Sequence, residues 1–181
     1  YGVMPDIAIF GKALGNGYAI TAVIGKRDIM QAAQKTFISS TFWTERIGST
    51  AGLKTLEVME STKSWEIISK KGKKIKKGWA KLARKHQLEI SIFGIDALPG
   101  FSIISKNMIY YKTYITQEML KKGFLASNVV YVCTEHKDEY IDNYFYILDN
   151  LFRDIKDFEN GKDIYNYLDG PVSHSGFKRL N

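Results

Sequence analysis

Lys12 has the most unusual setting among the side chains that could do covalent chemistry. It follows a short apolar run, Ile7 to Phe10, and stands near the start of a glycine-rich loop that extends to Gly17. A lysine at a strand end can project into a crevice, and glycines let a ligand approach the backbone closely. Desolvation there favours a neutral amine, which can form an imine with an aldehyde. A plain surface lysine in a loop is the alternative that this local pattern leaves open.

The other reactive residue types carry weaker signals. His86, His136 and His174 lack metal-ligand spacing, so we interpret them as structural or surface residues and expect no metal site. Cys133 is the only cysteine, which excludes an intrachain disulfide and favours a reducing cytoplasm. Because Cys133 ends an apolar run, we expect it in the core. The order of residues around Lys12 also excludes a Walker-type phosphate loop.

The elements that must position Lys12 alternate between strands and helices. Strands are predicted at 7–10 and 19–24, a helical turn at 28–33, and helices from 45 or 46 to about 60 and over 64–86. Further on, the patterns predict strands at 88–93, 101–105 and 129–133, and helices at 114–122 and 138–158. Gly123 is a typical helix end. The second half therefore has the pattern of a small α/β lobe.

The strand at 7–10 suggests how the chain is organised. A buried parallel strand needs neighbours on both sides and helices on both faces of its sheet. The first 60 residues offer too few elements for such a sheet, so we expect the chain to begin inside a larger domain. The predicted domain boundary lies at the basic helix, which gives domains of 1–62 and 63–181.

The net charge of +7 invites a nucleic-acid hypothesis. Many of the cations lie in the helix at 64–86, where Trp65, Ile68, Ile75, Trp79 and Leu82 form one apolar stripe. The lysines then occupy the wet faces, so we favour an ordinary solvated helix and expect no nucleic-acid partner; a basic binding module remains the alternative. No run of about 18 apolar residues and no signal peptide occurs, so no membrane partner is expected.

Three stretches, in order along the chain, resemble the class III aminotransferases. The segment from Pro5 to Tyr18, PDIAIFGKALGNGY, resembles the cofactor-lysine segment of that family. Ser40-Thr41-Phe42 and then Ala51 to Glu57, AGLKTLE, resemble its G-T segment and the helix after it. The ending from Gly170 to Leu180, GPVSHSGFKRL, resembles the carboxy-terminus of glutamate-1-semialdehyde aminomutase-like members.

The resemblance implies the carboxy-terminal portion of a fold-type I enzyme. Residues 1–62 would be the end of the large domain that binds pyridoxal 5'-phosphate (PLP), and 63–181 the small α/β domain. Lys12 would hold PLP as a Schiff base and act as general base in amino-group transfer, as an aminotransferase or aminomutase. Thr41 would reach the cofactor phosphate of a partner subunit in a homodimer. A helix N-cap is the alternative role for Thr41.

Two departures limit this resemblance. Glu45-Arg46 replaces the more usual asparagine-proline pair after the threonine, which could alter substrate recognition. The family's phosphate loop, ring-stacking aromatic residue and pyridine-pairing aspartate precede the lysine, and this chain has none of them. We therefore expect the isolated chain to be inactive on a small-molecule amino donor and acceptor. A non-catalytic fragment or scaffold that does not bind cofactor is the remaining alternative.

Overall fold

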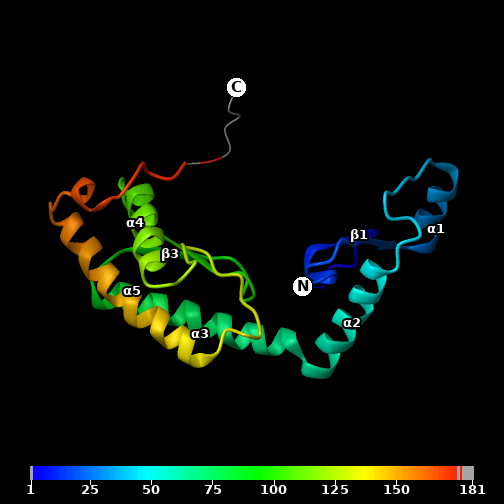
Figure 1. The fold of residues 1–181 in the computed structure, drawn as a ribbon, viewed down its shortest axis with the longest axis horizontal. Coiled ribbons are helices and arrows are strands. Elements are labelled where there is room, and N and C mark those ends of the chain that lie inside the picture. Colours follow the sequence, from blue (N-terminus) through cyan, green and yellow to red (C-terminus); the bar gives the residue numbers. More distant parts are fainter. Residues whose placement is uncertain (1, 175, 177–181) are drawn as a thin grey trace. The chain divides into compact units, whose positions relative to one another are not determined.

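The computed structural model describes residues 2–174 and 176. The chain forms two compact units, Tyr1–Ser64 and Trp65–Asn181. Each contains both strands and helices (Figure 1). The mixed α/β class that the sequence predicts is therefore present, and we describe each unit by itself.

The first unit is built on an antiparallel hairpin. Strand β1 (Ile7–Phe10) pairs with β2 (Ala22–Gly25), in a register that places Ile7 opposite Gly25 and Phe10 opposite Ala22. The remaining elements are η1 (Lys12–Leu14), α1 (Arg27–Met30), η2 (Gln31–Lys35) and the long α2 (Ile47–Thr62). Our expectation of a parallel neighbour is not met among the described residues, and the second strand starts three residues later than predicted.

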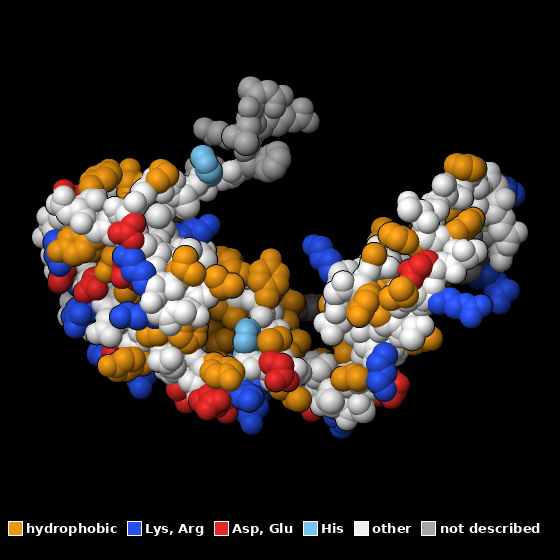
Figure 2. All heavy atoms as spheres, in the orientation of Figure 1, with side chains coloured by type: hydrophobic (Ala, Val, Ile, Leu, Met, Phe, Trp, Pro, Cys, Tyr) orange, Lys and Arg blue, Asp and Glu red, His pale blue; other side chains and the backbone are white. Residues whose placement is uncertain are grey.

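The hairpin exposes most of its apolar side chains. Ile9 is 76% exposed, and Ile7, Phe10, Val23 and Ile24 are also exposed. Apolar side chains extend over the visible face of this unit (Figure 2). The prediction of a buried strand is therefore wrong for the chain as it stands, because none of the described residues covers this surface. Large exposed apolar patches are typical of interaction or ligand-binding surfaces.

The second unit combines three long helices with a short hairpin. Its helices are α3 (Ser64–Lys85), α4 (Met108–Lys121) and α5 (Asp138–Glu159), followed by η3 (Ile164–Tyr167). Strands β3 (Ile90–Phe93) and β4 (Gly100–Ile103) pair antiparallel. The predicted strand at 129–133 is wrong: Val129 forms only an isolated bridge with Gly100, although the amide of Val130 still donates to the Pro99 carbonyl at 3.0 Å.

The apolar stripe of α3 forms one side of the core of this unit. Trp79 is fully buried and packs at 4.8 Å, centroid to centroid, against the ring of Phe101 on β4. Phe101 in turn contacts Phe152 of α5. Burying large apolar side chains of this kind contributes about 1.5–3 kcal/mol each. The stripe of α3 is therefore a packing surface, as the sequence indicates.

The part of the chain that the structure describes contains neither a membrane-spanning helix nor a metal-ligand cluster. No helix there is both long enough and apolar enough to span a bilayer. Within the same residues, no three or more histidines, cysteines, aspartates or glutamates come together as a metal site.

Candidate functional site

Lys12 lies directly after β1, in the first position of η1. The turn is closed by two backbone hydrogen bonds, from Leu14 to the Gly11 carbonyl at 3.1 Å and from Gly15 to the Lys12 carbonyl at 3.2 Å. The backbone of Lys12 has a φ of 49°. This value lies in the left-handed region, which residues other than glycine and asparagine seldom adopt. Its side chain is exposed. None of the described residues therefore buries this side chain.

The loop after Lys12 depends on its glycines and on Asn16. Gly15 is buried, and a Cβ at this position would collide with the carbonyl oxygen of Tyr18. Gly17 has φ of 109°, and Asn16 has φ of 46°. Asparagine tolerates that left-handed conformation better than most residues. The tight, specially shaped loop predicted from the sequence is confirmed.

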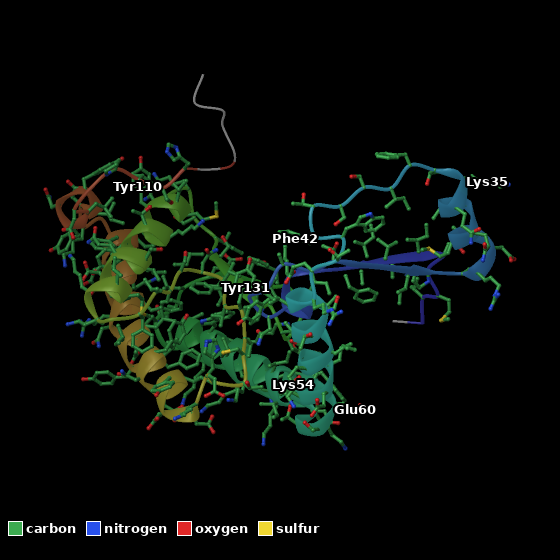
Figure 3. The ribbon with its side chains drawn as sticks, turned by 45° about the vertical axis from the view of Figure 1, so that its right-hand side comes forward. Lys35, Phe42, Lys54, Glu60, Tyr110 and Tyr131 are labelled. Carbon is green, nitrogen blue, oxygen red and sulfur yellow. The ribbon has the colours of Figure 1, made fainter. Side chains whose placement is uncertain are left out.

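The Lys12 hollow is an open cavity of about 820 Å³ within the first unit. Its lining comes from three segments: the Lys12 loop with the residues that lead into β2, the segment before α2, and the first turn of α2. The lining residues are Lys12, Gly17, Tyr18, Ala19, Ile20, Thr21, Ser40, Phe42, Glu45, Gly48 and Ser49. Phe42 is on the loop that leads into α2 (Figure 3). Among the described residues of this lining, Lys12 and Glu45 carry the only charged side chains.

Gly48 brings the first turn of α2 against the loop. A Cβ at Gly48 would press on the carbonyl oxygen of Ala19 and on the side chain of Ile20. Gly52, one turn later, is also buried and lies near Ile20 and Leu14. Two glycines on one face of α2 therefore let the helix backbone approach the Lys12 loop closely. This contact fixes where the amino end of α2 meets the hollow.

Thr41 is exposed and does not line the hollow, although its neighbours Ser40 and Phe42 do. The helix N-cap alternative for Thr41 is wrong, because α2 begins at Ile47 and Arg46 occupies the cap position. The side chain that satisfies an amide of the first turn belongs to Glu45, whose Oε1 accepts from the Ile47 amide at 2.7 Å. The sequence indicated Glu45 only as a departure from a family pattern.

The histidines and the cysteine have other roles. His86 contacts Asp149 through Nε2 at 2.6 Å, and the ring of His136 is the acceptor for the Cys133 amide at 3.4 Å. Burial lowers the pKa of His136, and the nearby Lys71 lowers it further. These contacts fit the structural role predicted for both rings. Cys133 is exposed, so its predicted place in the core is wrong.

A comparison with protein families identifies the class of protein. The model of the family aminotransferase class-III matches residues 1–145. The chain therefore belongs to the class III aminotransferases, as the three motifs indicated. Of the carboxy-terminal motif at 170–180, Ser175 and residues 177–180 lie outside the described residues.

Curated relatives of the chain include several members of this family. The 3-aminobutyryl-CoA aminotransferase of Cloacimonas acidaminovorans (strain Evry) is 33% identical over 145 residues, which are 77% of this chain and 35% of that relative. The glutamate-1-semialdehyde 2,1-aminomutase of Methanocaldococcus jannaschii is 25% identical over 173 residues, 86% of this chain and 40% of that relative. The chain thus spans well under half the length of the curated relatives it matches.

Solved structures show the same fold. The PLP internal aldimine form of the FumI protein of Sphingopyxis sp. MTA144 superposes with a TM-score of 0.79 at 20% identity, covering 91% of this chain and 40% of that one. A transaminase with PLP bound gives a TM-score of 0.76 at 17% identity, and the match covers 88% of this chain and 41% of that one. The chain therefore has the fold of the corresponding part of these PLP-dependent enzymes.

Proposed function

We propose that this chain supplies the lysine half of a PLP site for amino-group transfer, as an aminotransferase or aminomutase. The observation that carries the proposal is the placement of Lys12: it follows β1, in a strained turn, at the edge of a hollow large enough for a cofactor. We assign 1–62 to the end of the large domain and 63–181 to the small domain. Family membership supports this assignment.

The residues around the hollow fit one end of PLP. The amine of Lys12 is exposed, and at Gly17 nothing lies within 4 Å of the place where a Cβ would stand. A planar ligand can therefore approach the backbone there. The one carboxylate of the lining, Glu45, already accepts from the amide of Ile47. The fit thus covers covalent attachment, and the hydroxyls of Thr21, Ser40 and Ser49 can donate to a phosphate, but the lining has no arginine to pair with its charge.

Bound PLP supplies the electron sink that makes a proton on the substrate's Cα removable. Lys12 has two duties in this proposal. Its Nζ holds the cofactor between turnovers, and when free it takes the proton from Cα and returns it. The close packing of Gly48 against Ala19 keeps the loop in place while the amine moves. A rigid backbone beneath a mobile side chain suits a group that alternates between attachment and proton transfer.

Thr41 is proposed to serve the cofactor phosphate of the partner subunit in a homodimer. Its side chain is exposed and lies outside the lining of the Lys12 hollow. A threonine hydroxyl and a backbone amide are common donors to phosphate. The single cysteine of the sequence supports a reducing compartment such as the cytoplasm.

The direct test is borohydride reduction of an enzyme that contains this chain and the remaining length of a class III aminotransferase. Peptide mapping after reduction should find the cofactor on Lys12. Lys26 is the matched internal control, because it lies in the same unit and its Nζ is held by Asp6 at 2.6 Å. Cofactor on Lys26, or on any lysine other than Lys12, contradicts the assignment.

A further inference from the structure

Five cations define the outer stripe of α3: Lys70, Lys73, Lys77, Lys81 and Arg84. All five side chains are exposed. They recur at steps of three or four residues, so they share one side of the helix, opposite the buried Ile75, Trp79 and Leu82. At a rise of 1.5 Å per residue the stripe is about 21 Å long.

The other lysines of α3 are engaged in the fold. Lys74 bridges Asp138 at 2.9 Å and Asp142 at 2.7 Å, and the amine of Lys76 donates to Asp96 at 3.1 Å. Lys71 donates to the carbonyl oxygens of Thr134 and His136, and Lys85 is paired with Asp149. These contacts hold α3 against its neighbours, so the amines of these lysines already have partners within the fold.

The positive charge of the outer stripe, by contrast, has almost no carboxylate partners. Among the described residues, its one carboxylate neighbour within 4 Å is Asp96, which lies 3.9 Å from the amine of Lys73. After Glu66, α3 contains no acidic residue. Lys73, Lys77 and Lys81 follow one another at four-residue steps, where like charges repel. A linear polyanion lying along the stripe would relieve this repulsion and release its own counterions.

Trp65 belongs by its spacing to the apolar stripe of α3, yet its indole is 46% exposed. It lines a shallow hollow of about 750 Å³, whose other lining residues are Glu66, Ser69, Lys70, Lys73, Lys74 and Lys77. An exposed aromatic ring beside a row of cations is the arrangement on which bases of single strands stack. The apolar residues of the rest of α3 face the core, so the helix has no apolar face to insert into a membrane.

We propose that the outer stripe of α3 binds single-stranded nucleic acid, with phosphates on its five cations and a base on Trp65. The sequence alone favoured a solvated face. The structure separates the lysines of α3 whose amines are held by partners within the fold from the cations of the outer stripe, which form a continuous row. This surface is independent of Lys12 and goes beyond the proposed amino-group transfer.

The test measures anisotropy of a labelled dodecamer of oligouridylate titrated with the 181-residue chain at several salt concentrations. Five phosphate contacts give a slope of log K against log salt of about −3.5. The variant K70Q/K77Q/K81Q/R84Q should bind at least about tenfold more weakly at low salt, with a slope near about −0.7. W65A should weaken binding about fivefold and leave the slope unchanged.

The matched control is K35Q/K54Q/K106Q/K122Q, which removes the same net charge from exposed lysines outside the stripe. It should keep the wild-type affinity within about threefold. Equal loss in the two quadruple variants would overturn the proposal, because net charge alone would then explain binding. So would absence of binding at low salt, or displacement of the RNA by polyglutamate at matched charge, since the surface would then not require phosphates and bases.

Discussion

Trp79 of α3 donates a hydrogen bond of 2.9 Å from Nε1 to the hydroxyl of Tyr144 on α5, inside the core of the second unit. Both side chains are buried. Burial raises the pKa of Tyr144, and the indole N–H opposes that rise only in part. The hydroxyl therefore stays protonated and accepts from the indole. The hydrogen bond therefore links α3 to α5 through two residues that are 65 positions apart in the sequence.

Replacing Tyr144 with phenylalanine should destabilise the chain. Tyr144→Phe removes the acceptor and leaves the buried indole N–H without a partner, which costs about 1–3 kcal/mol. Urea unfolding followed by tryptophan fluorescence measures this difference. Tyr146→Phe is the control, because Tyr146 is on the same helix and is 74% exposed. Equal effects of the two substitutions would show that the hydrogen bond contributes nothing specific.

Acid should weaken the contact between α4 and α5. The carboxylate of Glu159 accepts from the hydroxyls of Tyr111 and Ser105. The Tyr111 hydroxyl lowers the pKa of Glu159 below its ordinary value of 4.5, while partial burial acts in the opposite direction. A lowered folded-state pKa gives stability that is present above the ordinary value and is lost as the pH falls through the folded value.

The unfolding free energy of Glu159→Gln should therefore depend less on pH than that of the wild type between about pH 5 and pH 3. Denaturant midpoints at a series of pH values measure the two slopes. Glu89→Gln is a suitable control, because the Glu89 side chain is exposed. If the Glu159 variant keeps the full wild-type slope, the carboxylate does not couple the two helices.

Subunit complementation tests the separate duties of Lys12 and Thr41. In a homodimer where Thr41 serves the partner, a hybrid of a Lys12→Asn subunit and a Thr41→Val subunit keeps one intact site. That site combines Lys12 of one subunit with Thr41 of the other. Random mixing of the two inactive variants should therefore restore about a quarter of the wild-type activity.

The hybrid should be prepared in an enzyme that joins this chain to the remaining length of a class III aminotransferase, as in the proposed reduction experiment. Sedimentation of each variant checks that the dimer still forms. If Thr41 served the cofactor of its own subunit, every site in the hybrid would lack one of the two residues. Mixing would then restore nothing, and the proposed role across the interface would be wrong.

The 181-residue chain alone should not retain PLP. Among its described lining residues, the Lys12 hollow has Lys12 as its one cation and otherwise only neutral hydroxyls for the phosphate, so it offers weak imine formation and a weak hold on the phosphate charge. The absorbance of a lysine-linked cofactor should disappear on desalting, and Lys12→Asn should behave in the same way. A stoichiometric, lysine-linked chromophore that survives desalting would show that the chain already holds a complete site.

Long periodic patterns made the helices of the second unit predictable. Each of α3 and α5 is 22 residues long and carries a periodic apolar stripe, and both helices match their predicted bounds within one residue. The start of α4 at Met108 was missed, because Ile109, Tyr110 and Tyr111 are residue types that favour strands. Residues 129–133 have a strand composition, yet their pairing with β4 ends after one bridge.

The Lys12 loop was predictable because its glycines stand in the sequence. Gly15 is required because the Tyr18 carbonyl approaches it closely, and Gly17 is required because its φ is positive. The glycine-rich local sequence already predicts both constraints. The contribution of Glu45 to the hollow was not predictable. It depends on the residue at which α2 begins, and on the packing of Gly48 against Ala19, which joins segments far apart in the chain.

The left-handed backbone of Lys12 bears on how the protein could be stabilised. Glycine or asparagine would relax that conformation by about 1 kcal/mol, and neither has a reactive amine. Any selection for heat resistance alone would therefore discard this lysine early. Variants selected for heat resistance alone that nevertheless retain Lys12 would show that the strain at this position is small.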